Sequence, residues 1–517
     1  MKVLGILYLN DKTTYVGQKG EKLKKFKSIY NGEELLVKTK RETMHQTYCI
    51  VNKNDNTVIE YLDELNINPS LISEKMALLN WTYRHTNIYK NAKNIDSIKE
   101  IDLTPDRINI LNHNIISVDP DGSQDIDDAI SINNTNNQLE IYIHISDPTS
   151  YIDTNTDLDN ELLIRSSSIY LDKTHHMLPE KLATDIISLK KGILKRAYTF
   201  VIKFNTNNLD DISKILKDNK NDINYDFKFI KTNILVTENL TYNEFENIRK
   251  IQNNCSYTDN DYYTYIYNLG KIILDGLDIP YLDYDSHKMI EAYMILCNMC
   301  ASKNCILKRS NKLDVNITNI KNYIQYNQTS AEYTIENNIH EGLNISYTHF
   351  TSPIRRYADM IVHRLLYDPN HYDKYENNNN NKLINMIDII NSTSKYYKKV
   401  YNMFNLFNLF YQINNIDNTF VEKEGLIVEK EGLIVGIEYN LLKLLIDNKI
   451  FLANIVNKKI IDNEIVSIIN KENILYINYK NINREYRIGQ TINLKIYYLN
   501  MNINPFKIII DNIDNFF

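Results

Sequence analysis

Five aspartates fall within ten residues between two apolar runs, and this segment constrains the fold more than any other. Residues 115–132 read I-I-S-V-D-P-D-G-S-Q-D-I-D-D-A-I-S-I, with β-branched residues at both ends that predict a strand on each side. So many carboxylates repel one another unless a cation neutralises them, and hard ions such as Mg²⁺ prefer oxygen ligands. The segment therefore indicates a cation site. Its acids are Asp119, Asp121, Asp125, Asp127 and Asp128.

Alternation along an extended chain places Asp125 and Asp127 on one face and Asp128 on the other, so we expect a turn or bulge that gathers them. Three alternatives compete with a Mg²⁺-type site. One is a solvated acidic loop. Another is a calcium loop, which requires Gly at its sixth position, where counting from Asp119 finds Gln124. The third is a haloacid-dehalogenase-type phosphatase. The residues D-P-D-G-S resemble the first motif of that family, which also requires a later acidic motif and a Lys.

Composition places the chain among ordinary globular proteins. It has 517 residues, enough for two to four domains, with 43% apolar and 24% charged residues. The net charge of −6 means that any nucleic acid must bind through local positive patches. The five cysteines include Cys297 and Cys300 in an apolar helical run, where we expect core packing. An odd cysteine count without an export signal predicts an intracellular, cytoplasmic protein, and no stretch is apolar enough for a membrane span.

The periodicity of the chain divides it into four parts. Short alternating strands at both ends predict two small β-barrels, and the region between them begins with strands and becomes helical. Long helices are expected near residues 287–303 and 382–411. The expected domains are a barrel over 1–65, a helical linker or barrel remnant over 66–113, an α+β domain over 114–415, and a second barrel over 418–517.

A basic segment lies inside the first predicted barrel. Residues 12–41 hold nine Lys and Arg against three Glu, a local charge of 9 − 3 = +6, interleaved with Tyr15, Phe26 and Tyr30. Basic and aromatic side chains on a barrel suit single-stranded nucleic acid through phosphate contacts and base stacking. A solvated charged loop is the alternative.

A second functional segment, residues 347–366, reads Y-T-H-F-T-S-P-I-R-R-Y-A-D-M-I-V-H-R-L-L. Ser352 and Pro353 are typical of a helix start, which would place Arg355 in the first turn and on one face with Asp359 and His363. An Arg beside the free N–H groups of a helix start would attract an anion such as phosphate. The alternative is an intrahelical ion pair between Arg355 and Asp359.

These segments and three others together resemble the RNB family of processive 3′→5′ exoribonucleases, which includes ribonuclease II, ribonuclease R and the exosome catalytic subunit. The resemblance covers roughly residues 100–410. It rests on D-P-x₄-D-I-D-D-A, H-I-S-D, R-S-S-S-I-Y with M-L-P-E-K-L, S-L-K-K-G, and the segment 347–366. It implies an α+β multidomain protein with an N-terminal OB or cold-shock-type β-barrel, a central RNB catalytic domain and a C-terminal RNA-binding OB-type barrel. Family members usually carry two N-terminal barrels, and here there is room for one.

The resemblance also implies an activity and its residues. The expected function is Mg²⁺-dependent hydrolysis of single-stranded RNA to nucleoside 5′-monophosphates by a two-metal mechanism in a monomer, with Mn²⁺ as a substitute ion. A catalytically inactive RNA-binding protein on the same fold is the alternative. The implied metal ligands are Asp119, Asp125, Asp127 and Asp128, with Asp127 also catalytic. Arg355 would contact the scissile phosphate, Tyr170 would stack on the 3′-terminal nucleotide, and Tyr242 and Glu291 would line the RNA channel.

Overall fold

The structure of the protein is a computed structural model. It describes residues 2–8, 15–17, 21–28, 34–39, 46–61, 106–135, 137–171, 174–254, 262–281, 283–311, 331–372, 382–414, 427–438, 441–446, 449–454, 460–461, 464–465, 467–471, 474–479, 482–498 and 506–510. The expected helical linker over 66–113 therefore lies almost wholly outside the described residues. Within them, no helix is both long enough and apolar enough to cross a membrane.

The N-terminal strands form one six-stranded sheet whose pairing closes on itself. Its order is β1-β5-β6-β4-β3-β2, and β1 also pairs with β3. The apolar faces of the strands meet inside, where Leu7, Phe26, Val37, Cys49 and Val51 are fully buried. Phe26 therefore packs in the core and is not a stacking platform for bases. The strands are β1 (Lys2–Tyr8), β2 (Tyr15–Val16), β3 (Lys22–Ser28), β4 (Glu34–Lys38), β5 (Gln46–Asn52) and β6 (Thr57–Tyr61).

The centre of the molecule is a seven-stranded mixed sheet with the order β15-β8-β9-β10-β13-β14-β7. The two edge pairs, β14 with β7 and β15 with β8, are parallel, and the other pairs are antiparallel. Strand β7 lies ahead of residue 114, where we expected the catalytic domain to begin, so the sheet starts earlier than predicted. The strands are β7 (Ile108–Ile110), β8 (Ile116–Asp119), β9 (Asp128–Thr135), β10 (Gln138–Ser146), β13 (Leu194–Phe204), β14 (Asp226–Leu235) and β15 (Glu238–Thr241).

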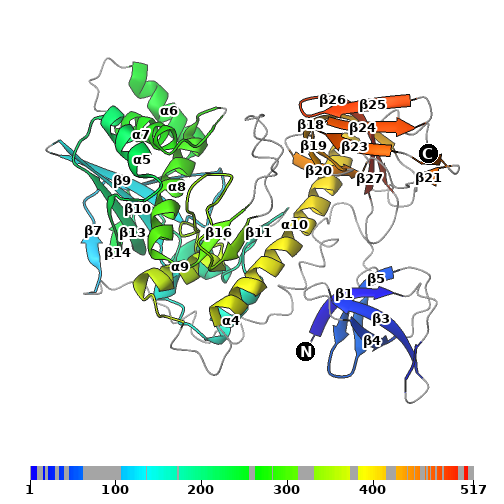
Figure 1. The fold of residues 1–517 in the computed structure, drawn as a ribbon. Helices are drawn as coiled ribbons and strands as arrows, with labels where there is room; N and C mark the ends of the chain where they lie inside the picture. Colours follow the sequence, from blue (N-terminus) through cyan, green and yellow to red (C-terminus); the bar gives the residue numbers. More distant parts are fainter. Residues whose placement is uncertain are drawn as a thin grey trace.

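Helices pack on this sheet (Figure 1), and between them lies the largest hydrophobic core found among the described residues. The predicted helix at 287–303 is α8, and both Cys297 and Cys300 lie buried in it, which confirms their packing role. Nearly every turn of α8 is buried, which fits its apolar composition. The helices are α4 (Asp157–Arg165), α5 (Leu209–Asn219), α6 (Tyr242–Asn254), α7 (Tyr262–Gly276), α8 (Ser286–Asn304) and α9 (Tyr357–Tyr367).

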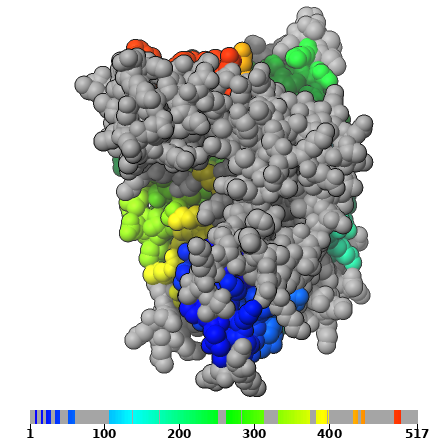
Figure 2. Space-filling model, turned by 90° about the vertical axis from the view of Figure 1, so that its right-hand side faces the viewer, coloured from blue at the N-terminus to red at the C-terminus, as the bar shows by residue number. Residues whose placement is uncertain are grey.

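Helix α10 (Lys382–Asn414) confirms the second long helix and runs from the central domain toward the C-terminal sheets (Figure 1). A five-stranded sheet, β20-β19-β18-β26-β27, lies beside α10. Two smaller sheets have the orders β23-β24-β25 and β21-β22. The N-terminal and C-terminal sheets lie toward opposite ends of the face shown in Figure 2. The strands are β18 (Ile427–Glu438), β19 (Leu441–Ile446), β20 (Lys449–Asn454), β21 (Ile460–Ile461), β22 (Glu464–Ile465), β23 (Ser467–Lys471), β24 (Ile474–Tyr479), β25 (Ile482–Arg487), β26 (Thr491–Tyr498) and β27 (Phe506–Ile510).

Candidate active site

The acidic segment forms a sharp turn between two neighbouring strands of the central sheet. Strand β8 ends at Asp119 and β9 begins at Asp128, and the backbone N–H of Ser123 donates to the Pro120 carbonyl at 3.2 Å. Gly122 takes a φ of +78°, a conformation that side chains with a Cβ rarely adopt. The predicted turn is thus confirmed, and all five aspartates of the segment line one cavity.

Hydrogen bonds from the segment S-L-K-K-G, residues 188–192, hold the backbone of this turn. The Ser188 hydroxyl donates to the Gln124 carbonyl at 2.7 Å and accepts from the Ile126 N–H at 3.0 Å. The Leu189 N–H donates to the Ile126 carbonyl at 3.0 Å. The backbone between Asp119 and Asp128 is therefore fixed although it belongs to no strand.

Asp127 is buried and Asp119 and Asp128 are half-buried, and the loss of water around these carboxyl groups raises their pKa values. Desolvation is the largest cause for each: it raises the pKa of Asp119 to about 6 and that of Asp127 to about 7, against the lowering effect of Arg355. Burial and then repulsion by Asp119 and Asp127 raise the pKa of Asp128 well above its ordinary value. The 3% exposure of Asp127 and the half-buried positions of Asp119 and Asp128 argue against a fully solvated acidic loop.

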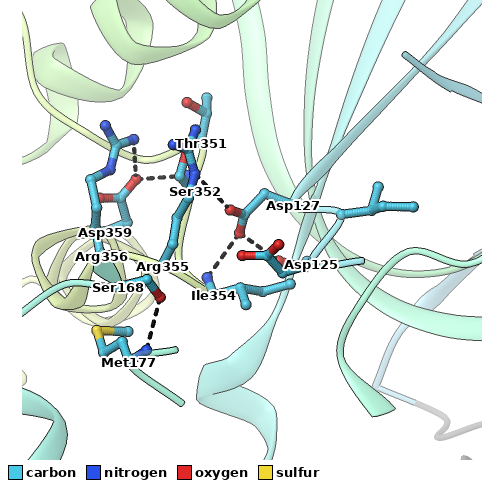
Figure 3. Close-up of polar contacts among 12 residues, drawn as sticks. Asp125, Asp127, Ser168, Met177, Thr351, Ser352, Ile354, Arg355, Arg356 and Asp359 are labelled. Atoms are coloured by element: carbon cyan, nitrogen blue, oxygen red, sulfur yellow. Dashed lines mark hydrogen bonds and ion pairs between the residues drawn. The ribbon is translucent and has the colours of Figure 1, made fainter. Parts of the chain in front are cut away.

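Asp127 is the meeting point of the sheet and the segment that precedes α9 (Figure 3). Its Oδ1 accepts the Ile354 N–H at 2.8 Å and the Ser146 hydroxyl at 3.3 Å, and its Oδ2 accepts Arg355 Nε at 3.2 Å. The side chain of Asp127 is 3% exposed, whereas that of Arg355 is 46% exposed. Arg355 therefore anchors its Nε on a buried carboxylate and one Nη on the Ser352 hydroxyl at 3.0 Å, while nearly half of its side chain stays exposed.

Helix α9 begins later than the sequence predicted. It starts at Tyr357, so Arg355 lies in a turn ahead of the helix and not in its first turn. Tertiary hydrogen bonds hold this turn: the Ser168 N–H donates to the Arg355 carbonyl at 2.9 Å, and the Tyr357 N–H donates to the Ser166 carbonyl at 2.8 Å. A chain fixed by these partners is not free to continue the helix back to Pro353.

The predicted helical face of Arg355, Asp359 and His363 is also wrong. Asp359 Oδ1 accepts from the Ser352 N–H at 2.7 Å and from Arg356 at 2.8 Å, so Asp359 pairs with Arg356 (Figure 3). His363 is buried with its Nε2 2.9 Å from the Phe350 carbonyl. Asp359 thus caps the turn that carries Arg355 and is not its ion-pair partner.

Tyr170 reaches the acidic turn from the short hairpin of β11 (Ile169–Tyr170) and β12 (Thr174–His175). Its hydroxyl donates to Asp125 Oδ2 at 2.7 Å, and its backbone N–H donates to the Tyr401 hydroxyl at 3.0 Å. The Ser168 hydroxyl accepts from the Met177 N–H at 2.8 Å and so joins the two chain segments that flank the hairpin (Figure 3). The Ser168 N–H donates to the Arg355 carbonyl, which ties the base of the hairpin to the Arg355 turn.

The two less specific predictions, Tyr242 and Glu291, line the same cavity from helices α6 and α8. Tyr242 begins α6, and its ring meets the edge of the His287 ring with centroids 5.4 Å apart. Burial and then the charges of Asp128 and Asp119 raise the pKa of Tyr242 to about 12. Glu291 lies one turn along α8 and accepts Lys288 Nζ at 2.5 Å.

All eight predicted site residues line one cavity of about 1050 Å³. Residues remote in sequence therefore converge, including the exposed Asp121 of the turn. The cavity wall also includes His176, Glu180, His287 and Ser352, which were not predicted as site residues. His176 directly follows the hairpin that carries Tyr170, and His287 is the first residue of the helical segment that suggested Glu291. Their position beside these motifs is the sequence signal that could have identified them as site residues.

The residues present fit a hard divalent cation in their chemistry. Asp119 Oδ2 is buried and accepts no hydrogen bond from a described residue, and the aspartates supply oxygen donors with an excess of negative charge. In the described ranges, however, no three His, Cys, Asp or Glu side chains are arranged to hold one ion together. Asp125 and Asp127 instead accept from Tyr170, Arg355 and Ile354, so an ion would have to compete with these donors.

Comparison with known proteins gives the family. A sequence model of the RNB domain matches residues 107–274 and 302–370. Ribonuclease R of Ureaplasma parvum serovar 3 is 27% identical over 429 residues, which cover 67% of this chain and 57% of that protein. Human exosome complex exonuclease RRP44 is 26% identical over 335 residues, covering 49% of this chain and 33% of the relative. The chain spans about half the length of several curated relatives that it matches.

Two solved structures show a similar fold. The apo form of Mycoplasma genitalium RNase R superposes with a TM-score of 0.63 at 17% identity, covering 99% of this chain and 89% of the other. Yeast Ssd1, described as a pseudonuclease, superposes with a TM-score of 0.67 at 13% identity, covering 99% and 83%. At these identities the likeness concerns the fold alone. The acidic motif that resembled a phosphatase thus lies in a matched RNB segment, and the chain is an RNB-domain protein, as its motifs predicted.

Proposed function

We propose that this protein is a Mg²⁺-dependent 3′→5′ exoribonuclease that degrades single-stranded RNA processively to nucleoside 5′-monophosphates. One observation carries the proposal: the four family aspartates, Arg355, Tyr170, Tyr242 and Glu291 all line a single cavity. The ribonuclease names of the sequence relatives support it. A related fold in complex with ribose-methylated single-stranded RNA supports RNA as the ligand.

The cavity residues divide the work of phosphodiester hydrolysis. Asp119, Asp125, Asp127 and Asp128 would hold Mg²⁺ or Mn²⁺, which when bound in a pair activates a water and neutralises charge on the phosphate. Arg355 extends toward solvent from its anchor on Asp127 and would stabilise the negative charge that develops on the terminal phosphate. Attack of water breaks the bond between phosphorus and O3′ of the preceding ribose, so the released nucleotide keeps its 5′-phosphate.

Two further groups would set direction and substrate. Tyr170 is 40% exposed at the cavity wall, a position from which its ring would stack on the 3′-terminal base. Tyr242 and Glu291, which line the same cavity, would contact the ribose and the following nucleotide, where a 2′-hydroxyl distinguishes RNA from DNA. We propose that the closed N-terminal sheet and the C-terminal sheets are OB-type barrels that guide RNA to an intracellular, monomeric enzyme.

A catalytically inactive RNA-binding protein is the second candidate. Two observations favour it: the described carboxylates are not arranged around a common ion, and one neighbour of similar fold is described as a pseudonuclease. Retention of all four acids weighs against it. The two candidates differ in one outcome, because an inactive protein binds RNA without shortening it.

The deciding experiment follows a 5′-labelled single-stranded RNA incubated with the protein and Mg²⁺. The wild type is compared with Asp127→Asn and with Asp121→Asn, a matched control that removes one exposed carboxylate from the same turn. Progressive shortening from the 3′ end by the wild type and by the control, but not by Asp127→Asn, establishes the enzyme. Bound but intact RNA with all three proteins establishes the RNA-binding alternative.

A further inference from the structure

One carboxylate oxygen of the cavity is already engaged by an aromatic side chain. Asp125 Oδ2 accepts the Tyr170 hydroxyl at 2.7 Å, which is the one hydrogen bond that the described residues give to this side chain. Asp125 is 12% exposed, so few water molecules compete for the oxygen. A short hydrogen bond from a neutral hydroxyl to a sheltered carboxylate is a strong one.

The hairpin that carries Tyr170 is fixed at its base and free at this side chain. Its backbone is held by Tyr401 of α10 and, through Ser168, by the Arg355 carbonyl. The Tyr170 ring itself remains 40% exposed at the cavity. A rotation of the side chain can therefore break the contact with Asp125 without moving the backbone or Arg355.

The Tyr170 hydroxyl and a cation bound to Asp125 would compete for the same oxygen, Asp125 Oδ2. We propose that Tyr170 gates the cation site: its hydroxyl occupies Asp125 when no RNA is present, and stacking on the 3′-terminal nucleotide withdraws it, so that the RNA end and the cation bind cooperatively. This inference rests on the proposed function, because it uses the same cation and the same RNA end. Linkage makes the effect reciprocal, since each ligand tightens the other by the same factor.

A second group of the same segment faces the same oxygen. His176 Nδ1 lies 3.8 Å from Asp125 Oδ2, is buried, and has no hydrogen-bond partner among the described residues. The carbonyl of His176 accepts from the buried Arg165 at 3.1 Å, which fixes its backbone. The His176 imidazole is thus too far from Asp125 Oδ2 for a hydrogen bond, and the Tyr170 hydroxyl makes the hydrogen bond to this oxygen instead.

The test measures Mn²⁺ binding by the loss of the electron paramagnetic resonance signal of the free ion. Tyr170→Phe keeps the ring and removes the hydroxyl, so it should bind Mn²⁺ about 10-fold more tightly than the wild type, the scale of a hydrogen bond to a charged group. Tyr142→Phe is the matched control, because that hydroxyl also donates to a carboxylate, Glu140, at 2.8 Å but lies outside the cavity. It should leave Mn²⁺ affinity unchanged.

The same titration with adenosine tests the coupling. Adenosine carries a base and ribose for Tyr170 to stack against but no phosphate that could bind the ion. It should tighten Mn²⁺ binding by the wild type and the control several-fold, and leave Tyr170→Phe unchanged. Equal Mn²⁺ affinity of Tyr170→Phe and the wild type, or equal tightening of both by adenosine, overturns the gate while the exoribonuclease stands. If none of the proteins binds Mn²⁺ and none shortens RNA, both the proposed function and the gate are overturned.

Discussion

Without a bound cation, the buried carboxyl group of Asp127 should make the protein more stable at pH 5 than at pH 8. Burial raises the pKa of Asp127 from its ordinary value of 3.8 to about 7 in the folded protein. Between these two values the folded protein holds a proton that the unfolded chain releases. The free energy of unfolding therefore falls as the pH rises through this window, and the stabilisation is complete only at a pH below the unfolded pKa.

The size of the effect follows from the two pKa values. Going from pH 8 to pH 5, protonation of Asp127 adds about 3 kcal/mol to the free energy of unfolding. Asp119, whose pKa burial raises to about 6, adds a smaller amount in the same direction. For a domain of this size, about 3 kcal/mol corresponds to a melting-temperature shift of roughly 6–12 °C.

The assay is thermal unfolding in EDTA at both pH values for the wild type and Asp127→Asn. Other titrating groups affect both proteins, so the informative quantity is the difference between their melting temperatures. The amide of the variant does not titrate in this range, and its carbonyl can still accept the Ile354 N–H that now bonds to Oδ1. The difference should favour the variant at pH 8 by roughly 6–12 °C more than at pH 5.

A melting-temperature difference that is the same at both pH values would refute this reasoning, because Asp127 would then be ionised in the folded protein throughout. A second check uses Mg²⁺ at pH 8. A cation that binds the ionised carboxylates stabilises the folded state by mass action, so it should raise the melting temperature of the wild type more than that of the variant.

Three further predictions test other parts of the site and fold. Arg355→Lys keeps the charge but cannot reproduce the guanidinium contact with Asp127, so RNA hydrolysis should fall about 10²–10³-fold with RNA affinity little changed, and activity within 10-fold of wild type would contradict this. Asp159→Ala leaves Arg364 buried without its partner at 2.8 Å and should cost about 3–5 kcal/mol in thermal unfolding; a negligible loss would show that the pair is not structural. Changing the four lysines of β3 (Lys22–Ser28) to Gln should lower the slope of log affinity for RNA against log salt by up to about 3, and an unchanged slope would remove β3 from the RNA path.

Local sequence patterns predicted many elements because their cause is local. Alternating apolar residues predicted most strands of the terminal sheets, although β2, β3, β19, β21 and β25 were missed. Apolar residues at helical spacing predicted α8 and α10. The start of α9 was predicted wrongly, because Ser352 and Pro353 are good helix starters by themselves but the Asp359 carboxylate and the Ser166 carbonyl take up the backbone N–H groups of this turn.

The sequence by itself determined which chemical groups the site contains, because the density of aspartates and the order of the motifs are properties of the chain. It also determined that a turn follows β8, since Gly122 permits the positive φ that the turn requires. Only the tertiary structure decided which groups meet. The partners of Asp127 and Asp125 lie 228 and 45 residues away in sequence, at Arg355 and Tyr170. No local propensity encodes such contacts, because they depend on how the central sheet, the hairpin and the turn before α9 pack together and exclude water.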